Sequence, residues 1–187
     1  MKNALLFIWE VVKLVSIALL IVLPVRYFLF QPFIVMGVSM EPNFQDNNYL
    51  IIDRLSYRFR EPKRGEVIVF TGPENVGPYY IKRIIGLPGE TIQIKDGQVM
   101  ILDEGKKMIL NETNFLFLGT QTMGNTKDVL EENEFFVLGD NRALSFDSRQ
   151  WGSLRRENII GRVALRVWPF NIFEVPEISK MLIENYE

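Results

Sequence analysis

Residues 91–102 read T-I-Q-I-K-D-G-Q-V-M-I-L, two alternating runs separated by Asp96 and Gly97. An Asp-Gly pair between two such runs is a strong hairpin signal, because both residues accept the positive φ of a tight turn. Short runs of the same kind recur beyond Gln31, with Gly and Pro in the segments between them. The pattern predicts a mainly β fold, an antiparallel β-sheet sandwich or barrel-like domain over residues 31–187.

The predicted strands are short runs rich in β-branched and aromatic residues. They are Phe33–Val35, Tyr49–Ile52, Glu66–Phe70, Tyr79–Ile85, Thr91–Lys95, Gln98–Leu102, Lys107–Leu110, Phe115–Leu118, Glu134–Leu138 and Ile159–Trp168. The polar residues 119–133 are predicted as a surface loop, and Glu177–Tyr186 as a short helix.

The composition limits the chemistry that the chain can carry out. It has 187 residues, 48% of them hydrophobic, which is enough for one domain with a core. The net charge of −2 argues against a nucleic-acid partner. Histidine and cysteine are absent, which excludes a Ser-His-Asp triad, a cysteine nucleophile and a zinc site built on these ligands. A nucleophile would be Ser or Thr with a desolvated lysine as base, and we expect no metal and no cofactor.

The N-terminal segment has the pattern of a membrane anchor. Val11–Phe30 is almost entirely apolar, and twenty helical residues rise about 30 Å, the thickness of the hydrocarbon core of a bilayer. Lys2 and Lys13 precede the uncharged centre of this segment, and residues 31–50 contain no Lys or Arg. By the positive-inside rule, residues 1–30 are a cytoplasmic N-terminus with a transmembrane helix, and residues 31–187 lie outside the cytoplasm.

Two alternatives to an uncleaved anchor are less consistent with the sequence. A cleavable signal peptide would use Val35 and Gly37, which lie too far beyond the apolar stretch, and Glu10 is out of place in a basic leader. A buried core helix would not need so many apolar residues at the N-terminus. The cations Arg54, Arg58, Arg60, Lys63 and Arg64 are interpreted as a solvated loop, with contact to anionic lipid headgroups as the alternative. The aromatic residues stay open between an ordinary core and a surface that rests on the bilayer; they are Phe30, Phe33, Trp168, Phe170 and Phe173.

Three segments carry candidate chemistry. Ser39 lies in G-V-S-M-E-P, a bent segment that would expose a nucleophile, although exposed loop serines are common. Lys82 shares a strand face with Tyr80 and Ile84. A lysine on an apolar face is costly unless it becomes neutral, and a neutral lysine is a general base. The alternative for Lys82 is a sheet edge with the amine in water. The third segment, residues 139–149, is a polar loop able to brace a site.

Taken in order, the three segments resemble the type I signal peptidases, and most closely the short, single-anchor members typical of Gram-positive bacteria. The matching stretches are S-M-x-P at residues 39–42, K-R-I-I-G-L-P-G-E at 82–90 and G-D-N-R-x-x-S-x-D-S-R-x-W-G at 139–152. The resemblance implies a membrane-bound serine endopeptidase with Ser39 as nucleophile and Lys82 as general base. It also implies that Ser145 hydrogen-bonds and orients the lysine, and that bracing positions are Arg83, Asp140, Asn141, Asp147 and Arg149.

The resemblance further implies the substrate, which is the signal peptide of an exported preprotein cut after small residues of an A-x-A pattern. Strand edges at residues 33–38 and 79–82 would pair with the extended peptide by β-augmentation. Positions that match the family's shallow pockets are Val35, Met40, Tyr80 and Ile81.

One position departs from part of the family. Gly37 stands where some members carry a serine that helps to bind the oxyanion, which leaves another amide or a water as the second donor. Two alternatives to a signal peptidase are a self-cleaving repressor, which would carry a DNA-binding module at its N-terminus, and a membrane-tethered, non-catalytic peptide-binding module of the same fold.

Overall fold

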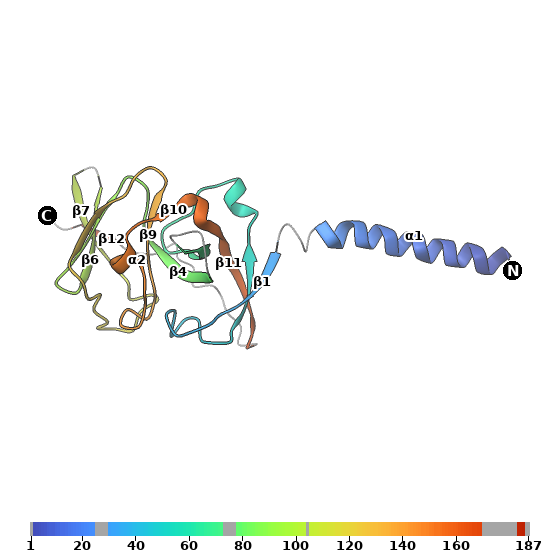
Figure 1. Cartoon of the computed structure of the whole chain (residues 1–187), viewed down its shortest axis with the longest axis horizontal. Helices are drawn as coiled ribbons and strands as arrows, with labels where there is room; N and C mark the ends of the chain where they lie inside the picture. Colours follow the sequence, from blue (N-terminus) through green and yellow to red (C-terminus); the bar gives the residue numbers. More distant parts are fainter. Residues whose placement is uncertain (1, 25–29, 73–77, 104, 170–182, 186–187) are drawn as a thin grey trace.

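The computed structural model describes residues 2–24, 30–72, 78–103, 105–169 and 183–185. In these ranges the chain forms a helix, α1 (Lys2–Pro24), and two antiparallel β-sheets that lie side by side (Figure 1). Short helical turns η2 (Ser56–Arg58), α2 (Ser148–Trp151) and η3 (Arg156–Asn158) connect the strands. The prediction of a mainly β, antiparallel fold is confirmed.

Helix α1 is displaced towards the N-terminus relative to the predicted span Val11–Phe30. It extends away from the sheets, and its described large apolar side chains, from Leu6 to Leu23, are exposed (Figure 1). Residues 25–29 of the predicted span lie outside the described residues. Within the described ranges, no helix combines the length and the apolar character needed to cross a membrane.

The first sheet has seven strands and is buried on both faces around its centre. Along β3, Val67 and Val69 pack into one apolar cluster, while Ile68 and Phe70 pack into another on the opposite side. This near-continuous hydrophobic pattern is expected of a strand covered on both faces. The strand order is β1 (Phe30–Ile34), β2 (Tyr49–Asp53), β11 (Ile159–Trp168), β3 (Val67–Thr71), β4 (Tyr79–Gly86), β9 (Glu134–Leu138) and β10 (Leu154–Arg155).

The second sheet contains the predicted hairpin. Asp96 and Gly97 have φ values of 52° and 78°, and β5 pairs with β6 in the register Lys95↔Gln98, so the Asp-Gly turn is confirmed. The core of this sheet also includes Ile85 and Phe136 from the first sheet, and this shared cluster holds the two sheets together. The strand order is β12 (Ile183–Asn185), β7 (Lys106–Leu110), β6 (Gln98–Asp103), β5 (Thr91–Lys95) and β8 (Thr126–Val129).

The structure corrects three local predictions and the barrel-like alternative. Phe115–Leu118 is not a strand but a loop, which the chain holds in place by burying Phe115 and Leu116. The predicted loop 119–133 contains the edge strand β8, whose polar side chains hid it. Ile183–Asn185 is a strand, and the rest of the predicted C-terminal helix lies outside the described residues. Both sheets are open, so the described strands do not form a closed barrel.

Candidate active site

Ser39 and Lys82 are brought together by the loop that follows β1 and by strand β4. The Lys82 Nζ donates hydrogen bonds to the Ser39 Oγ at 2.8 Å and to the Ile81 carbonyl at 3.0 Å. Strand β9 pairs with β4 only from Arg83 onward in the described sheet, so the loop with Ser39 can approach the first half of β4. Lys82 is 3% exposed, so the alternative of a lysine with its amine in water is wrong.

The protonation of Lys82 is governed by its burial. Desolvation lowers the pKa of the amine to about 8 from its ordinary 10.5, while the carboxylates of Asp147 and Asp140 act in the opposite direction. An amine with this pKa is neutral in a useful fraction of molecules near neutral pH. It can therefore accept the proton of the Ser39 hydroxyl with which it is hydrogen-bonded.

The loop that carries the candidate nucleophile Ser39, residues 35–48, is called the nucleophile loop, and hydrogen bonds on both sides of Ser39 fix it. Gly37 has a φ of 93°, a conformation that suits glycine, and its N–H donates to the Asp46 Oδ1 at 2.7 Å. The Phe44 N–H donates to the Met40 carbonyl at 2.9 Å, and the Asn141 N–H donates to the Ser39 carbonyl at 3.0 Å. Since the Gly37 amide is engaged by Asp46, it is not available to an oxyanion in this conformation.

The loop from residue 139 packs directly against Ser39, the candidate nucleophile. A Cβ on Gly139 would lie 2.2 Å from the Ser145 Oγ and 2.5 Å from the Ser39 carbonyl oxygen, so only glycine fits there. Ser145 is buried beside this contact, yet its Oγ has no hydrogen-bond partner among the described residues. The hydrogen bond expected between Ser145 and Lys82 is therefore not formed in this conformation.

Asp147 organises the second half of the same loop. Its side chain is fully buried and accepts hydrogen bonds from the Gly139 N–H at 3.0 Å and from the Arg149 Nε at 2.8 Å. It also caps α2 through a capping box with Gln150. Arg149 donates in turn to the Arg142 carbonyl at 2.7 Å. Two of the predicted bracing residues thus form one ion pair that holds the loop closed on itself.

A second buried ion pair joins β4 to the start of that loop. The guanidinium of Arg83 donates to the Asp140 carboxylate through Nε at 2.8 Å and through Nη2 at 2.6 Å. Asp140 also accepts from the Asn43 Nδ2 at 2.8 Å, and the Arg83 guanidinium lies 4.4 Å from the centre of the Phe115 ring. Because Arg83 follows Lys82 and Asp140 precedes Asn141, whose N–H binds the Ser39 carbonyl, this pair ties β4 to the loop that contacts Ser39.

The chain is similar to proteins of one known family. The family model described as "Signal peptidase, peptidase S26" matches residues 8–168. The chain belongs to this family. It is 36% identical to a signal peptidase I of Leptolyngbya laminosa over 169 residues, covering 87% of this chain and 80% of that protein. It is 37% identical to signal peptidase I V of Bacillus subtilis strain 168 over 166 residues, covering 83% and 95%. The resemblance to the signal peptidases is confirmed.

A solved structure is also similar. A crystal structure of a signal peptidase I from Enterococcus faecalis V583 superposes with a TM-score of 0.46 and 29% sequence identity. The superposition covers 56% of this chain and 97% of that one.

The four predicted pocket positions of this signal peptidase family member differ in accessibility. Val35 and Met40 are 4% and 0% exposed and belong to an apolar cluster, so in this conformation Met40 supports the site from below and offers no surface to a ligand. Tyr80 and Ile81 are partly exposed. The rings of Phe33 and Tyr79 meet edge to face at 5.2 Å, which places β1 beside the first half of β4.

The sequence analysis missed one buried network next to the site. Arg142 donates to the Glu112 carboxylate at 2.9 and 2.5 Å, to the Thr122 hydroxyl, and through its Nε to the Gly139 carbonyl at 3.0 Å. Its partners are distant in sequence, so only its place in the polar loop could have drawn attention to it. Among the described residues, no group of three His, Cys, Asp or Glu side chains could hold a metal ion.

Proposed function

We propose that this chain is a membrane-bound serine endopeptidase that removes N-terminal signal peptides from exported preproteins after small residues. The observation that carries the proposal is the 2.8 Å hydrogen bond between the Lys82 Nζ and the Ser39 Oγ, made by a buried amine. Membership of the signal peptidase family supports the same activity. The alternative of a non-catalytic peptide-binding module is not favoured by these relatives.

In the proposed reaction, the neutral Lys82 amine accepts the Ser39 proton while the Ser39 Oγ attacks the scissile carbonyl. The ammonium then gives this proton to the leaving amine, and an acyl-enzyme ester on Ser39 remains. A water, deprotonated by the same amine, hydrolyses the ester and restores the serine. The Ser39 backbone N–H is one oxyanion donor, and another amide or a water is the second, since Asp46 engages the Gly37 N–H.

The supporting residues position these two groups and do not contact the substrate. The Lys82 ammonium has three protons, of which two are used by the Ser39 Oγ and the Ile81 carbonyl. The Ser145 hydroxyl, buried without a partner among the described residues, is the proposed acceptor of the third when the substrate is bound. Arg83, Asp140, Asn141, Asp147 and Arg149 hold the surrounding loops.

The proposed substrate site is the space between β1 and the first half of β4. Strand β1 is the terminal strand of its sheet, and Tyr79–Lys82 has no ladder to β9 in the described residues, so both can pair with an extended peptide. The partly exposed Tyr80 and Ile81 would contact the peptide, with Val35 and Met40 beneath it. The resemblance to the family implies that the pockets at these positions are shallow, which would select small side chains.

The proposed cellular location is the membrane, with residues 1–30 as the cytoplasmic N-terminus and anchor, and 31–187 outside. The exposed apolar side chains of α1, from Leu6 to Leu23, support this, because in water such a helix would have no cover for its apolar faces. The domain also exposes Ile34, Tyr49 and Trp168, which are neighbours in register across β1, β2 and β11. We propose that they rest on the bilayer. Side chains of Phe30, Phe170 and Phe173 lie outside the described residues.

The test is cleavage of a purified preprotein in liposomes by the full chain, compared with Ser39→Ala and Lys82→Ala. We expect the wild type to cut after the A-x-A sequence and both variants to lose all detectable cleavage with their folds intact. Lys63→Ala is the matched control, because Lys63 is an exposed lysine outside the site. Cleavage that survives in Lys82→Ala would refute the dyad. Binding of the signal peptide without cleavage by the wild type would instead support the peptide-binding module.

A further inference from the structure

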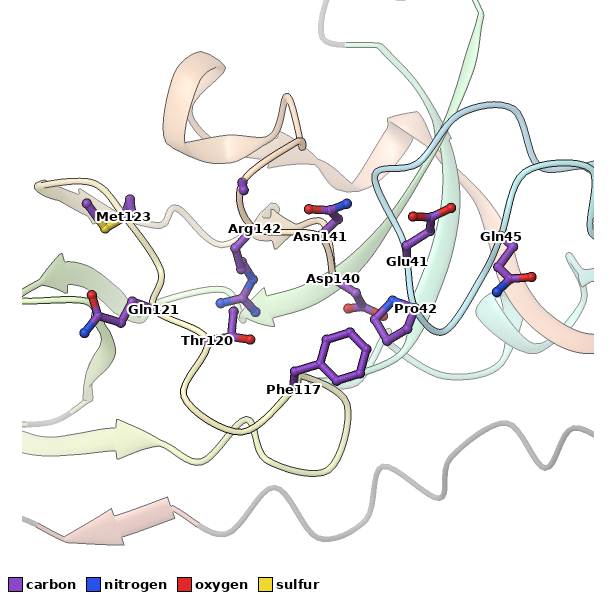
Figure 2. Close-up of a pocket in the computed structure, with 11 residues that line it drawn as sticks. Glu41, Pro42, Gln45, Phe117, Thr120, Gln121, Met123, Asp140, Asn141 and Arg142 are labelled. Atoms are coloured by element: carbon purple, nitrogen blue, oxygen red, sulfur yellow. The ribbon is translucent and has the colours of Figure 1, made fainter.

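A pocket of about 570 Å³ lies beside the nucleophile loop and is not lined by Ser39 or Lys82 (Figure 2). Its walls come from the nucleophile loop, from the loop between β7 and β8, and from the segment after β9. Figure 2 shows Phe117 next to Pro42 and Asp140 in the middle of the pocket, with Met123 and Gln121 at one end and Gln45 at the other. Its volume is within the range of pockets that bind small ligands or a few residues of a peptide.

The pocket offers both apolar surface and one uncompensated charge. Phe117 and Met123 are 70% and 69% exposed, although both are large apolar side chains. Two of the charged lining residues are neutralised within the protein, since Asp140 pairs with Arg83 and Arg142 pairs with Glu112. Glu41 is therefore the lining carboxylate without an ion pair among the described residues.

The pocket adjoins the segment that carries Ser39. Glu41 is two residues after Ser39, and the Asn141 N–H that lines the pocket donates to the Ser39 carbonyl. None of the residues that line the pocket belongs to β1 or to the first half of β4, so the pocket is separate from the proposed site for the signal peptide. A peptide that lies between β1 and β4 with its scissile carbonyl at the Ser39 Oγ could place the residues that follow this carbonyl in the adjoining pocket.

We propose that this pocket binds the residues that follow the scissile bond, and that Glu41 makes it favour a basic side chain over an acidic one there. The inference rests on the proposed function, since it concerns the mature part of the same substrate. Phe117 and Met123 would contact the peptide through apolar surface, while Asn141 and Gln121 offer amide groups to its backbone. The preference for a basic side chain would come from Glu41, because it is the one charged lining residue that forms no ion pair with another described residue.

The experiment uses three preprotein-derived peptides that differ only in the second residue after the cut, which is Lys, Gln or Glu. For the wild type in liposomes, we expect kcat/KM for the Lys peptide to exceed that for the Glu peptide about fivefold, as for a partly exposed ion pair. Glu41→Gln should bring this ratio close to one, and Glu41→Lys should invert it. The wild-type ratio should also fall as salt is raised, because the charges face solvent.

The control variant is Glu132→Gln, which changes the net charge equally from an exposed turn outside the pocket and should keep the wild-type ratio. Equal kcat/KM for the Lys and Glu peptides in the wild type, with the Gln peptide cut normally, would overturn the inference and leave the proposed function standing. The same change of ratio in Glu132→Gln and Glu41→Gln would also overturn it, because a long-range field would then explain the effect. Failure to cut all three peptides would overturn the proposed function itself.

Discussion

Replacing the proposed base with methionine should abolish cleavage and still stabilise the fold at neutral pH. Lys82 is 3% exposed, and the protonated amine is held away from water without an ion pair in the described residues. Methionine has a similar length, is apolar and adapts to irregular spaces in a core. The variant Lys82→Met therefore removes the cost of burying a charge while it keeps most of the packing.

The size of the gain follows from the displaced pKa. The pKa falls from 10.5 to about 8. Since one pKa unit corresponds to about 1.4 kcal/mol, burial of the charged form costs roughly 3 kcal/mol. The variant loses the hydrogen bonds of Lys82 to the Ser39 Oγ and the Ile81 carbonyl. Each is worth about 1 kcal/mol, so the net gain in the free energy of unfolding should be about 1 kcal/mol.

The extra stability of Lys82→Met over the wild type should decrease as the pH rises. The pKa of Lys82 in the folded state lies below its value in the unfolded chain, so between about pH 8 and 10.5 the unfolded chain keeps a proton that the folded state has released. Wild-type stability therefore rises with pH in this window through this group. Methionine does not titrate, and the advantage of the variant should be largest below pH 8 and shrink as the pH approaches 10.5.

The assay is urea unfolding of the full chain in detergent micelles, followed by circular dichroism between pH 6 and pH 10. Lys63→Met is the control, because it removes an exposed lysine and should change stability by less than about 0.5 kcal/mol at every pH. A Lys82→Met variant that is less stable than wild type at pH 7, or whose difference from wild type does not change with pH, would refute the argument that the amine is desolvated.

Three further outcomes are expected. In the wild type, kcat/KM should rise about tenfold between pH 7 and pH 9. The reason is that the neutral fraction of an amine with a pKa of about 8 increases from about 9% to about 91% over this range. A kcat/KM that does not change with pH would contradict a titrating base. Gly139→Ala should lose about 1–3 kcal/mol of stability in thermal unfolding and most of its cleavage activity, since the new Cβ would meet Ser145 and Ser39; unchanged activity would show that the loop can move apart. Asp140→Asn should lower the free energy of unfolding by about 3–5 kcal/mol in urea, because it leaves the guanidinium of Arg83 buried without its carboxylate. A loss as small as that caused by Glu157→Gln, which changes an exposed carboxylate, would refute this.

Most strands could be predicted because their signals are local. The period of two in Thr91–Lys95 and the Asp-Gly turn that follows it are set by neighbouring residues, and the structure has both. Phe115–Leu118 has the composition of a strand, but it forms a loop in which tertiary packing buries Phe115 and Leu116 and leaves Phe117 and Leu118 exposed. Strand β8 was missed for the opposite reason, since an edge strand can carry polar side chains.

The contacts within the candidate site could not be predicted from neighbouring residues in the sequence. That Lys82 lies on an apolar strand face follows from alternation, but its contact with Ser39 joins residues 43 positions apart. No periodicity predicts such a contact, and the family resemblance was needed to propose it. The Arg142–Glu112 pair, 30 positions apart, had no comparable signal. Likewise, the exposure of Tyr80 and Ile81 against the burial of Met40 depends on how the loop after β1 folds back.

The position of Asp147 couples two properties that might be expected to vary separately. One carboxylate caps α2, holds the Gly139 amide and raises the pKa of the lysine against its burial. Any substitution that removes its charge would shift the working pH range of the enzyme towards acid and weaken the loop in the same step. Relatives adapted to alkaline or acidic surroundings would therefore have to change the pKa of this lysine through other residues. Charged residues near the lysine that do not also support the loop are the positions where such a change would leave the fold intact.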